Sequence, residues 1–180
     1  LTQIQRQWLR QNIGIVLQEP FLFSRTIREN IAYGDLEATD GQIIEAAKKA
    51  NIHDYIMTLE KGYDTDVGER GVKLSGGQRQ RISIARCLLK DAPIVIFDEA
   101  TANVDLENEK ELMEAIAELT HDKTVIMIAH RLKTVRHAAQ ILVVDKGQIV
   151  QRGTHEALMA QGGIYRRFIT GREQAVGWKL

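Results

Sequence analysis

The chain has 180 residues, of which 44% are hydrophobic, and this is enough to bury a core in one domain or in one domain with a small subdomain. Lys+Arg and Asp+Glu both number 24, so there is no basic excess and we expect no nucleic-acid partner. The single cysteine, Cys87, excludes an intrachain disulfide and fits a core position in a helix, and no apolar run approaches the ~20 residues that span a bilayer.

Four short apolar runs have the length of strands and are bounded by polar or turn residues. We predict that they are buried strands of an α/β sheet: residues 13–17, 94–97, 124–128 and 141–144. Residues 106–119, between the second and third runs, carry apolar side chains at helical spacing, and Asp105 is placed to cap this helix. The order strand, helix, strand predicts a parallel crossover.

The residues between the first two predicted strands are helical in pattern. Apolar residues recur at helical spacing in residues 43–50 and 82–89 with no strand pattern between them, which predicts a helical subdomain inserted at about residues 24–92. Later in the chain, residues 145–148 predict a hairpin that gives the sheet a mixed edge, and Thr154 predicts the start of a final helix. The tail, residues 171–180, stays unassigned.

Residues 74–78 have the sequence Leu-Ser-Gly-Gly-Gln and form the most informative motif. Two adjacent glycines let the backbone approach a ligand without a Cβ in the way. A helix predicted to begin near Gln78 points its free N–H groups and its positive dipole end at the same place. We therefore expect an anion at this loop, with a plain Gly-Gly turn as the alternative.

This motif resembles the signature of the nucleotide-binding domain of ABC (ATP-binding cassette) transporters, and the resemblance covers about residues 13–168. It implies an α/β, P-loop NTPase-like fold, with a mostly parallel sheet and an inserted helical subdomain, in a partial nucleotide-binding domain over residues 1–170. It also implies ATP and Mg²⁺ as cofactors and a second nucleotide-binding domain that closes head to tail with the first. The nucleotide of that partner would be contacted by Ser75, Gly76, Gly77 and Gln78.

Candidate residues for the chemistry follow the predicted strands. Asp98 and Glu99 end the run of residues 94–97, in the arrangement called Walker B. The resemblance implies that Asp98 orients Mg²⁺ and that Glu99 acts as the general base. Gln18 matches the glutamine that reaches Mg²⁺ or its water, and His130 matches the histidine that contacts the terminal phosphate. Without the signature, each would be an ordinary polar residue at a strand end.

Other segments resemble contact surfaces of the family. Asp105 falls where the family has an aspartate that contacts the partner domain, although Asn103-Val104 replaces the usual Ala-Leu, and helix capping is its alternative role. Residues 65–71, around Glu69, resemble the loop with which exporter-type cassettes touch the membrane domain. Phe21 and Phe23 resemble a second part of that surface, with core packing as the alternative. The resemblance therefore implies an ATPase that powers export, at the cytoplasmic face of a membrane.

A P-loop, which surrounds the β and γ phosphates, is not found, because no glycine of this chain is followed by lysine. Since the sequence begins with Leu1, we expect the C-terminal portion of a nucleotide-binding domain that lacks its N-terminal strands. By itself this portion is expected neither to bind ATP saturably nor to hydrolyse it. The alternatives are a soluble ABC-type ATPase of DNA repair or translation and a non-catalytic interaction module. Four further histidines are expected at the surface: His53, His121, His137 and His155.

Overall fold

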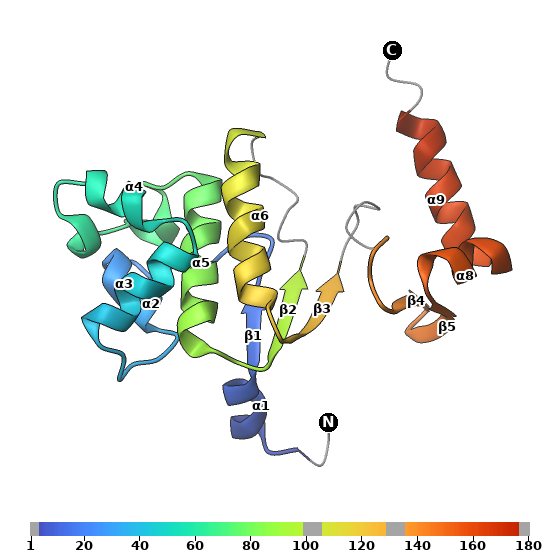
Figure 1. Cartoon of the computed structure of the whole chain (residues 1–180), viewed down its shortest axis with the longest axis horizontal. Helices are drawn as coiled ribbons and strands as arrows, with labels where there is room; N and C mark the ends of the chain where they lie inside the picture. Colours follow the sequence, from blue (N-terminus) through green and yellow to red (C-terminus); the bar gives the residue numbers. More distant parts are fainter. Residues whose placement is uncertain (1–3, 99–105, 129–135, 177–180) are drawn as a thin grey trace. The chain divides into compact units, whose positions relative to one another are not determined.

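The computed structural model describes residues 4–98, 106–128 and 136–176 of the chain. The chain divides into two compact units, Leu1–Ile128 and Ala129–Leu180, and each is described by itself (Figure 1). In the part of the chain that is described, the first unit holds a three-stranded sheet with helices, and the second holds a hairpin with two helices.

The first unit is built on a parallel sheet. Its described strands lie in the order β1 (Ile13–Val16), β2 (Ile94–Asp98) and β3 (Thr124–Ile128). The register sets Val16 beside Phe97 and Asp98 beside Ile128. The helix α6 (Leu106–Thr120) connects β2 to β3, which confirms the predicted parallel crossover and its helix.

Helices fill the chain between β1 and β2. They are α2 (Ile27–Ala32), α3 (Asp40–Lys49), α4 (His53–Thr58), the 3-10 turns η1 (Gly62–Asp64) and η2 (Glu69–Gly71), and α5 (Gly76–Lys90), while α1 (Arg6–Asn12) precedes β1. Thr26, Thr39 and Ser75 begin α2, α3 and α5 with capping boxes, in which the N-cap and the residue three positions later bond each other's backbone. In the segment between β1 and β2, the described β-pairing is one isolated bridge, which joins Thr26 to Asp66, so this segment is helical, as its apolar spacing predicts.

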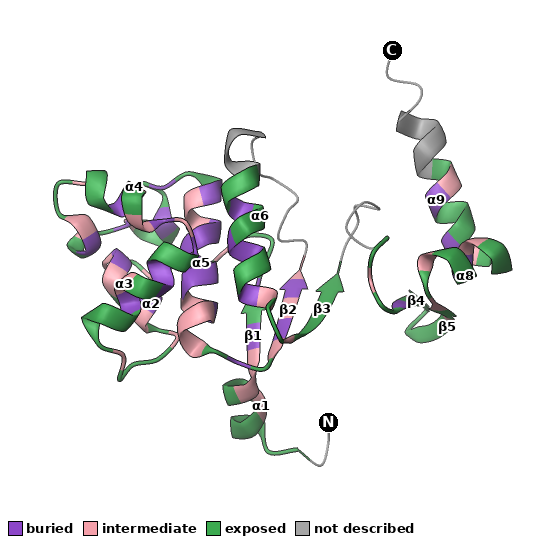
Figure 2. Ribbon diagram, viewed as in Figure 1, coloured by how far each residue is buried: buried purple, intermediate pink, exposed green. Residues whose placement is uncertain are grey.

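One hydrophobic core joins the sheet to its helices. Val16, Val95 and Phe97 are buried and belong to the same cluster as Leu112 of α6 and Cys87 of α5. Figure 2 shows buried residues along α5 and also in α3 and β2. Cys87 thus occupies the core position in a helix that the sequence predicts.

The opposite face of this sheet is exposed. Ile15 of β1 is 51% exposed, and Ile126 and Ile128 of β3 are 48% and 50% exposed. The prediction of a buried strand is therefore wrong for β3, every residue of which is exposed. The reason is that β3 is an outer strand of the described sheet and the described helices bury neither of its faces, since Val125 and Met127 on the other face are each 37% exposed. Runs that are apolar at every position are typical of parallel strands buried on both faces, so the sequence did not reveal the difference.

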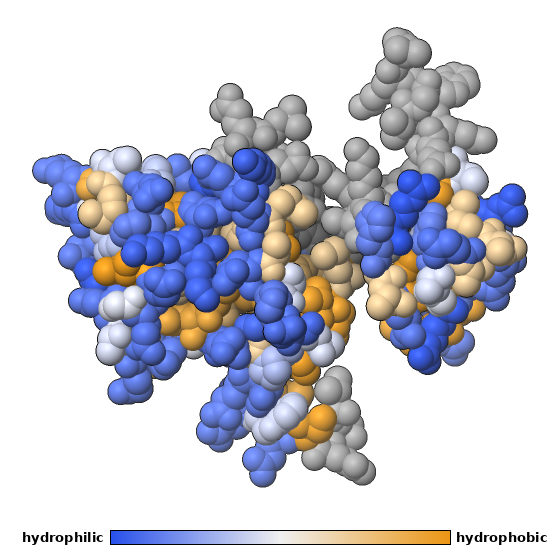
Figure 3. Space-filling view, viewed as in Figure 1, coloured by the Kyte–Doolittle hydropathy of each residue, from blue (hydrophilic) through white to orange (hydrophobic). Residues whose placement is uncertain are grey.

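The helices of the first unit keep polar residues on their outer sides. In α3, Ile43, Ala46 and Ala47 are buried, whereas Asp40 and Glu45 are exposed. Figure 3 shows the result, because the face of the helical part seen in that view is mostly hydrophilic. Among the described helices, none combines the length and the apolar character needed to cross a membrane.

The second unit is a hairpin packed with helices: β4 (Ile141–Asp145), β5 (Gln148–Gly153), α8 (His155–Gln161) and α9 (Gly163–Val176). Lys146 and Gly147 have positive φ angles of 48° and 78°, as a tight hairpin turn requires. Ile141 and Leu158 are buried in a small core of this unit. Both the hairpin and the start of a helix at Thr154 confirm the predictions, but this helix is not the final one, because α9 follows it.

The second unit differs from the sequence predictions at its C-terminal end. The helix α9 continues to Val176, into the tail that the sequence left unassigned. Gly162 and Gly163 stand at its start, with φ angles of 78° and 83°, and obscure the pattern there.

Candidate functional site

The Leu-Ser-Gly-Gly-Gln motif forms the turn into α5, which begins two residues before the predicted position. Ser75 is the N-cap: its hydroxyl accepts from the Gln78 N–H (3.2 Å), and the Gln78 side-chain oxygen accepts from the Ser75 N–H (2.8 Å). A first helical hydrogen bond runs from the Arg79 N–H to the Ser75 carbonyl (3.0 Å). The N–H groups of Gly76 and Gly77 therefore have no carbonyl acceptor within the helix, and they lie at its positive end, where an anion binds well.

The motif is anchored through its first residue. Leu74 is buried, its carbonyl accepts from Arg79 Nη1 (2.6 Å), and its N–H donates to the Gly71 carbonyl (3.0 Å). Gly71 has a φ angle of +76°, and a Cβ there would lie 3.0 Å from Leu22 Cδ1. Both the angle and the close approach require glycine. Residues 65–71 thus pack against Leu22 as well as against the start of α5.

Two candidate residues follow neighbouring strand ends. Asp98 is the last residue of β2, and Gln18 comes two residues after β1 ends at Val16, which the register sets beside Phe97. Asp98 is half-buried and Gln18 is exposed. The carboxyl ends of parallel strands form the edge at which open α/β folds bind ligands. A carboxylate and an amide carbonyl are oxygen donors of the kind that Mg²⁺ prefers, so these two residues fit the predicted metal.

The motif lies at this same edge because α5 runs antiparallel to β1. Side chains of α5 donate to backbone carbonyls along the β1 segment: Gln80 Nε2 to Leu17 (3.2 Å), Cys87 Sγ to Ile15 (3.5 Å) and Lys90 Nζ to Ile13 (2.7 Å). The residue number rises along the helix as it falls along the strand. The N-terminus of α5 is therefore at the carboxyl end of the sheet, on the side of Gln18 and Asp98.

Three of the sequence-predicted site residues, Glu99, Asp105 and His130, lie outside the described residues. Their positions in the sequence still relate them to described neighbours. Glu99 directly follows Asp98, and His130 comes two residues after Ile128, which the register sets beside Asp98. Their roles stay predictions.

Comparison with known proteins decides the family. The family model described as ABC transporter matches residues 1–102, which is more than half of the chain. The chain belongs to the ABC transporter family. The matched segment runs from α1 through β2 and so includes both the signature motif and Asp98.

Two curated relatives and one solved structure are similar to most of the chain. A multidrug export ATP-binding/permease protein of Staphylococcus aureus is 55% identical over 157 residues, which are 87% of this chain and 27% of the relative. The protein YgaD of Bacillus subtilis, with the same description, is 54% identical over 162 residues, 90% of this chain and 28% of the relative. The structure of a bacterial Atm1-family ABC exporter with ATP bound has a TM-score of 0.86 and 42% identity, covering 96% of this chain and 30% of that chain. The chain thus spans less than a third of the length of these family members.

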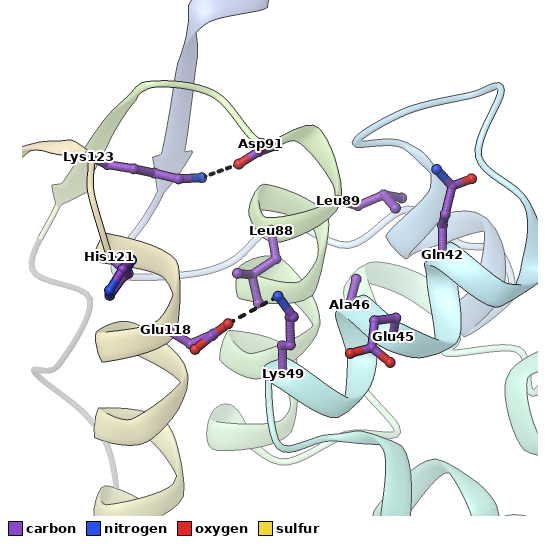
Figure 4. A pocket seen from close by; sticks show the side chains of 10 residues that line it. All are labelled: Gln42, Glu45, Ala46, Lys49, Leu88, Leu89, Asp91, Glu118, His121 and Lys123. Atoms are coloured by element: carbon purple, nitrogen blue, oxygen red, sulfur yellow. Dashed lines mark hydrogen bonds and ion pairs between the residues drawn. The ribbon is translucent and has the colours of Figure 1, made fainter.

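A pocket of about 530 Å³ lies at the other end of α5, beside Leu88 (Figure 4). Four of its charged side chains form two ion pairs: Lys49 of α3 contacts Glu118 of α6 (3.1 Å), and Lys123 contacts Asp91 (2.8 Å). Since α5 rises about 1.5 Å per residue, this pocket is roughly 20 Å from the signature. It is therefore a junction of α3, α5 and α6, separate from the ABC signature.

Two of the four other histidines differ from the prediction. His53 Nδ1 and the Tyr63 hydroxyl are 2.8 Å apart, as are His155 Nδ1 and the Tyr165 hydroxyl. Both histidines are half-buried, so the expected surface position is wrong for them. Burial raises the pKa of Tyr63 to about 12, which keeps its hydroxyl protonated. A tyrosine ten positions after a histidine is no recognised pattern, so these two contacts could not be predicted from the sequence. The prediction holds for the two exposed residues, His121 and His137.

Proposed function

We propose that this chain is part of the nucleotide-binding domain of an exporter-type ABC transporter, in which ATP binding and hydrolysis drive export across a membrane. The observation that carries the proposal is the signature motif at the N-terminus of α5, at the same sheet edge as Asp98. The names of the relatives, multidrug export ATP-binding/permease proteins, favour export over the soluble ATPases of DNA repair or translation. In such an exporter this domain lies at the cytoplasmic face of the membrane.

In this proposal, the residues that follow the strands bind the chain's own nucleotide and its Mg²⁺. Asp98 holds Mg²⁺, Glu99 accepts a proton from the attacking water, and the Gln18 amide contacts the metal or its water. His130 contacts the terminal phosphate. When bound, Mg²⁺ neutralises charge on the phosphates. The position of Asp98, half-buried at the carboxyl end of β2, supports its role, because ligands bind at this edge in open α/β folds.

The signature serves the nucleotide of a second domain, identical or related, that closes head to tail with the first. Ser75 and Gly76 are exposed, so another molecule has access to the start of α5. The capping box occupies the Gln78 side chain and leaves the N–H groups of Gly76 and Gly77 for phosphate oxygens. Asp105 contacts the same partner across the interface.

A membrane-domain contact is proposed at the surface of Phe21, Phe23 and Glu69. Phe21 is 50% exposed and its ring meets that of Phe23 edge to face, with centroids 5.1 Å apart, while Glu69 is exposed. The two segments are neighbours, because the Ile27 N–H donates to the Thr65 carbonyl (3.0 Å) and Leu22 packs at Gly71. One coherent docking surface is thereby available to a partner.

The test is the substitution Glu99→Gln in the complete protein. We expect ATP turnover to fall by ~10²–10⁴ while ATP binding is kept, because the amide is close in shape to the carboxylate but cannot act as a base. Glu60→Gln, at an exposed position in the helical part, is the matched control and should leave both quantities unchanged. Undiminished turnover in Glu99→Gln would refute the assignment.

A further inference from the structure

Arg86 of α5 holds the backbone of two segments outside its own helix. Its Nε donates to the Asn30 carbonyl (2.8 Å), its Nη2 to Asn30 Oδ1 (3.1 Å) and its Nη1 to the Phe21 carbonyl (3.1 Å). The guanidinium also lies over two rings, 5.7 Å from the centroid of Phe23 and 5.8 Å from that of Tyr33. Burial lowers the pKa of Arg86, a sign that the charge has been removed from water for these contacts.

Asn30 completes the arrangement around the segment of residues 21–23. This residue is fully buried, and its side chain bonds both backbone groups of Phe23, accepting from the N–H (2.8 Å) and donating to the carbonyl (3.0 Å). With its backbone fixed, the segment presents Phe21 at 50% exposure, and the Phe23 ring packs against that of Tyr33, the residue after α2, with centroids 4.5 Å apart. Arg86 and Asn30 therefore set the position of the aromatic docking surface defined above.

Helix α5 also bonds the chain that leads from β1 into residues 21–23. Gln80 Nε2 donates to the Leu17 carbonyl, and Arg86 Nη1 to that of Phe21. The loop between these two carbonyls, residues 18–20, includes Gln18, and both of its ends are therefore bonded to α5. Gln80 and Arg86 stand about 9 Å apart along the helix axis, so a movement of α5 displaces both ends together.

We propose that Arg86 is a positioning residue that couples the Gln18 loop and the aromatic docking surface to the helix that begins with the signature. This inference rests on the proposed function for the roles of Gln18 and the docking surface, but its geometry is a property of this chain alone. Lysine cannot replace the guanidinium here, since a single ammonium group lacks the planar fork that reaches two carbonyls and an amide at once.

The first experiment is amide hydrogen exchange on the full 180-residue chain with Arg86→Lys. Peptides that contain residues 17–24 should exchange about tenfold faster at the Phe23 N–H, because a single ammonium group cannot bond both the Phe21 carbonyl and Asn30, which accepts from that N–H. Arg28→Lys is the matched control: Arg28 bonds Asp64 (3.0 Å) and lies 5.7 Å from the Tyr63 ring, but is not bonded to this segment. Equal exchange of residues 17–24 in both variants would overturn the proposal.

A second variant guards against misfolding of Arg86→Lys. Gln80→Met keeps the length of the side chain but removes its donation to the Leu17 carbonyl, at the other end of the loop. It should accelerate exchange of the amides at the end of β1, just before the bonded Leu17, and leave α3 unaffected. Wild-type exchange at the end of β1 would contradict the bonding of this loop to α5.

The final experiment separates positioning from catalysis in the complete protein. Arg86→Lys should lower kcat about tenfold with the KM for ATP unchanged, since Arg86 is bonded to the Gln18 loop and a misplaced loop costs rate. Arg28→Lys should alter neither. An equal loss of kcat in the two variants would show a general effect of destabilisation and overturn the proposal. A wild-type protein that hydrolyses no ATP would refute the proposed function, and hydrogen exchange would still decide the role of Arg86.

Discussion

Replacing Gly34 with alanine tests how closely α2 approaches α5. Gly34 follows α2, and a Cβ at this position would lie 2.2 Å from the backbone carbonyl oxygen of Arg86 and 3.3 Å from the Lys90 nitrogen. A carbon and an oxygen in contact need about 1 Å more. The backbone of α5 cannot yield without losing helical hydrogen bonds, so α2 must move away and take Ile31, which is fully buried, partly out of the core. We expect a loss of about 3 kcal/mol of unfolding free energy.

Gly41→Ala is the matched control for this prediction. A Cβ at Gly41, in α3, would meet no atom closer than Thr39 Oγ1 at 3.9 Å, and the residue is exposed. Alanine should therefore stabilise the helix by about 0.5 kcal/mol. In urea unfolding of the full chain, followed by far-UV circular dichroism, Gly34→Ala should lower the midpoint by about 1.5 M and Gly41→Ala should raise it slightly. A Gly34→Ala chain as stable as the wild type would show that the approach of α2 to α5 is not the one described.

Ser75→Ala should lower the unfolding free energy by about 1 kcal/mol, read from the urea midpoint, because the Gln78 N–H loses its capping acceptor; an unchanged midpoint would contradict the cap. Hydrogen bonds from Thr26 lower the pKa of Glu29, so its stabilising contribution is present above the ordinary pKa of 4.5 and is lost as the pH falls through the folded value. In Glu29→Gln the urea midpoint should fall less steeply as the pH is lowered. An unaltered slope would show that the Glu29 carboxylate does not contribute to the acid sensitivity of the fold. Burial raises the pKa of the Cys87 thiol, so the folded chain should react with an aromatic disulfide reagent at least ~10-fold more slowly than the chain in urea, whereas equal rates would mean that the thiol is accessible.

Hydrophobic pattern predicted the elements that are long or apolar throughout. The strands β1 and β2, the crossover to β3 and the helices α3, α5 and α6 all carry several apolar residues at a regular spacing, and each is found. The short helices α2 and α4 were not predicted individually, because six residues are too few to establish a helical period. The start of α2 depends instead on local hydrogen bonds, those of the capping box between Thr26 and Glu29. The sequence pattern of a capping box covers only four residues.

The sequence was enough to predict which residues belong to the candidate site, but only the fold shows that some of them lie near one another. The sequence placed Gln18 and Asp98 each at a strand end and the signature at a helix start. Only the antiparallel course of α5 along β1 shows that all of them share one edge of the sheet. No pattern predicted the bond from Gln80 to the Leu17 carbonyl, since a contact between residues 63 positions apart depends on tertiary structure.

The polar residues of α5 show why the periodic pattern captured this helix but missed its connections. Besides its apolar positions, α5 buries Gln80, Arg81 and Ser83, and a buried polar side chain is costly unless it finds a partner. Gln80 bonds the strand end and Arg81 pairs with Glu111 of α6. An amphipathic helix would present such residues to water, so the burial of Gln80 and Arg81 marks two places where α5 is joined to another part of the fold. The departures of α5 from its own hydrophobic period therefore identify, better than the period itself, the contacts through which a movement of the signature would reach the rest of the domain.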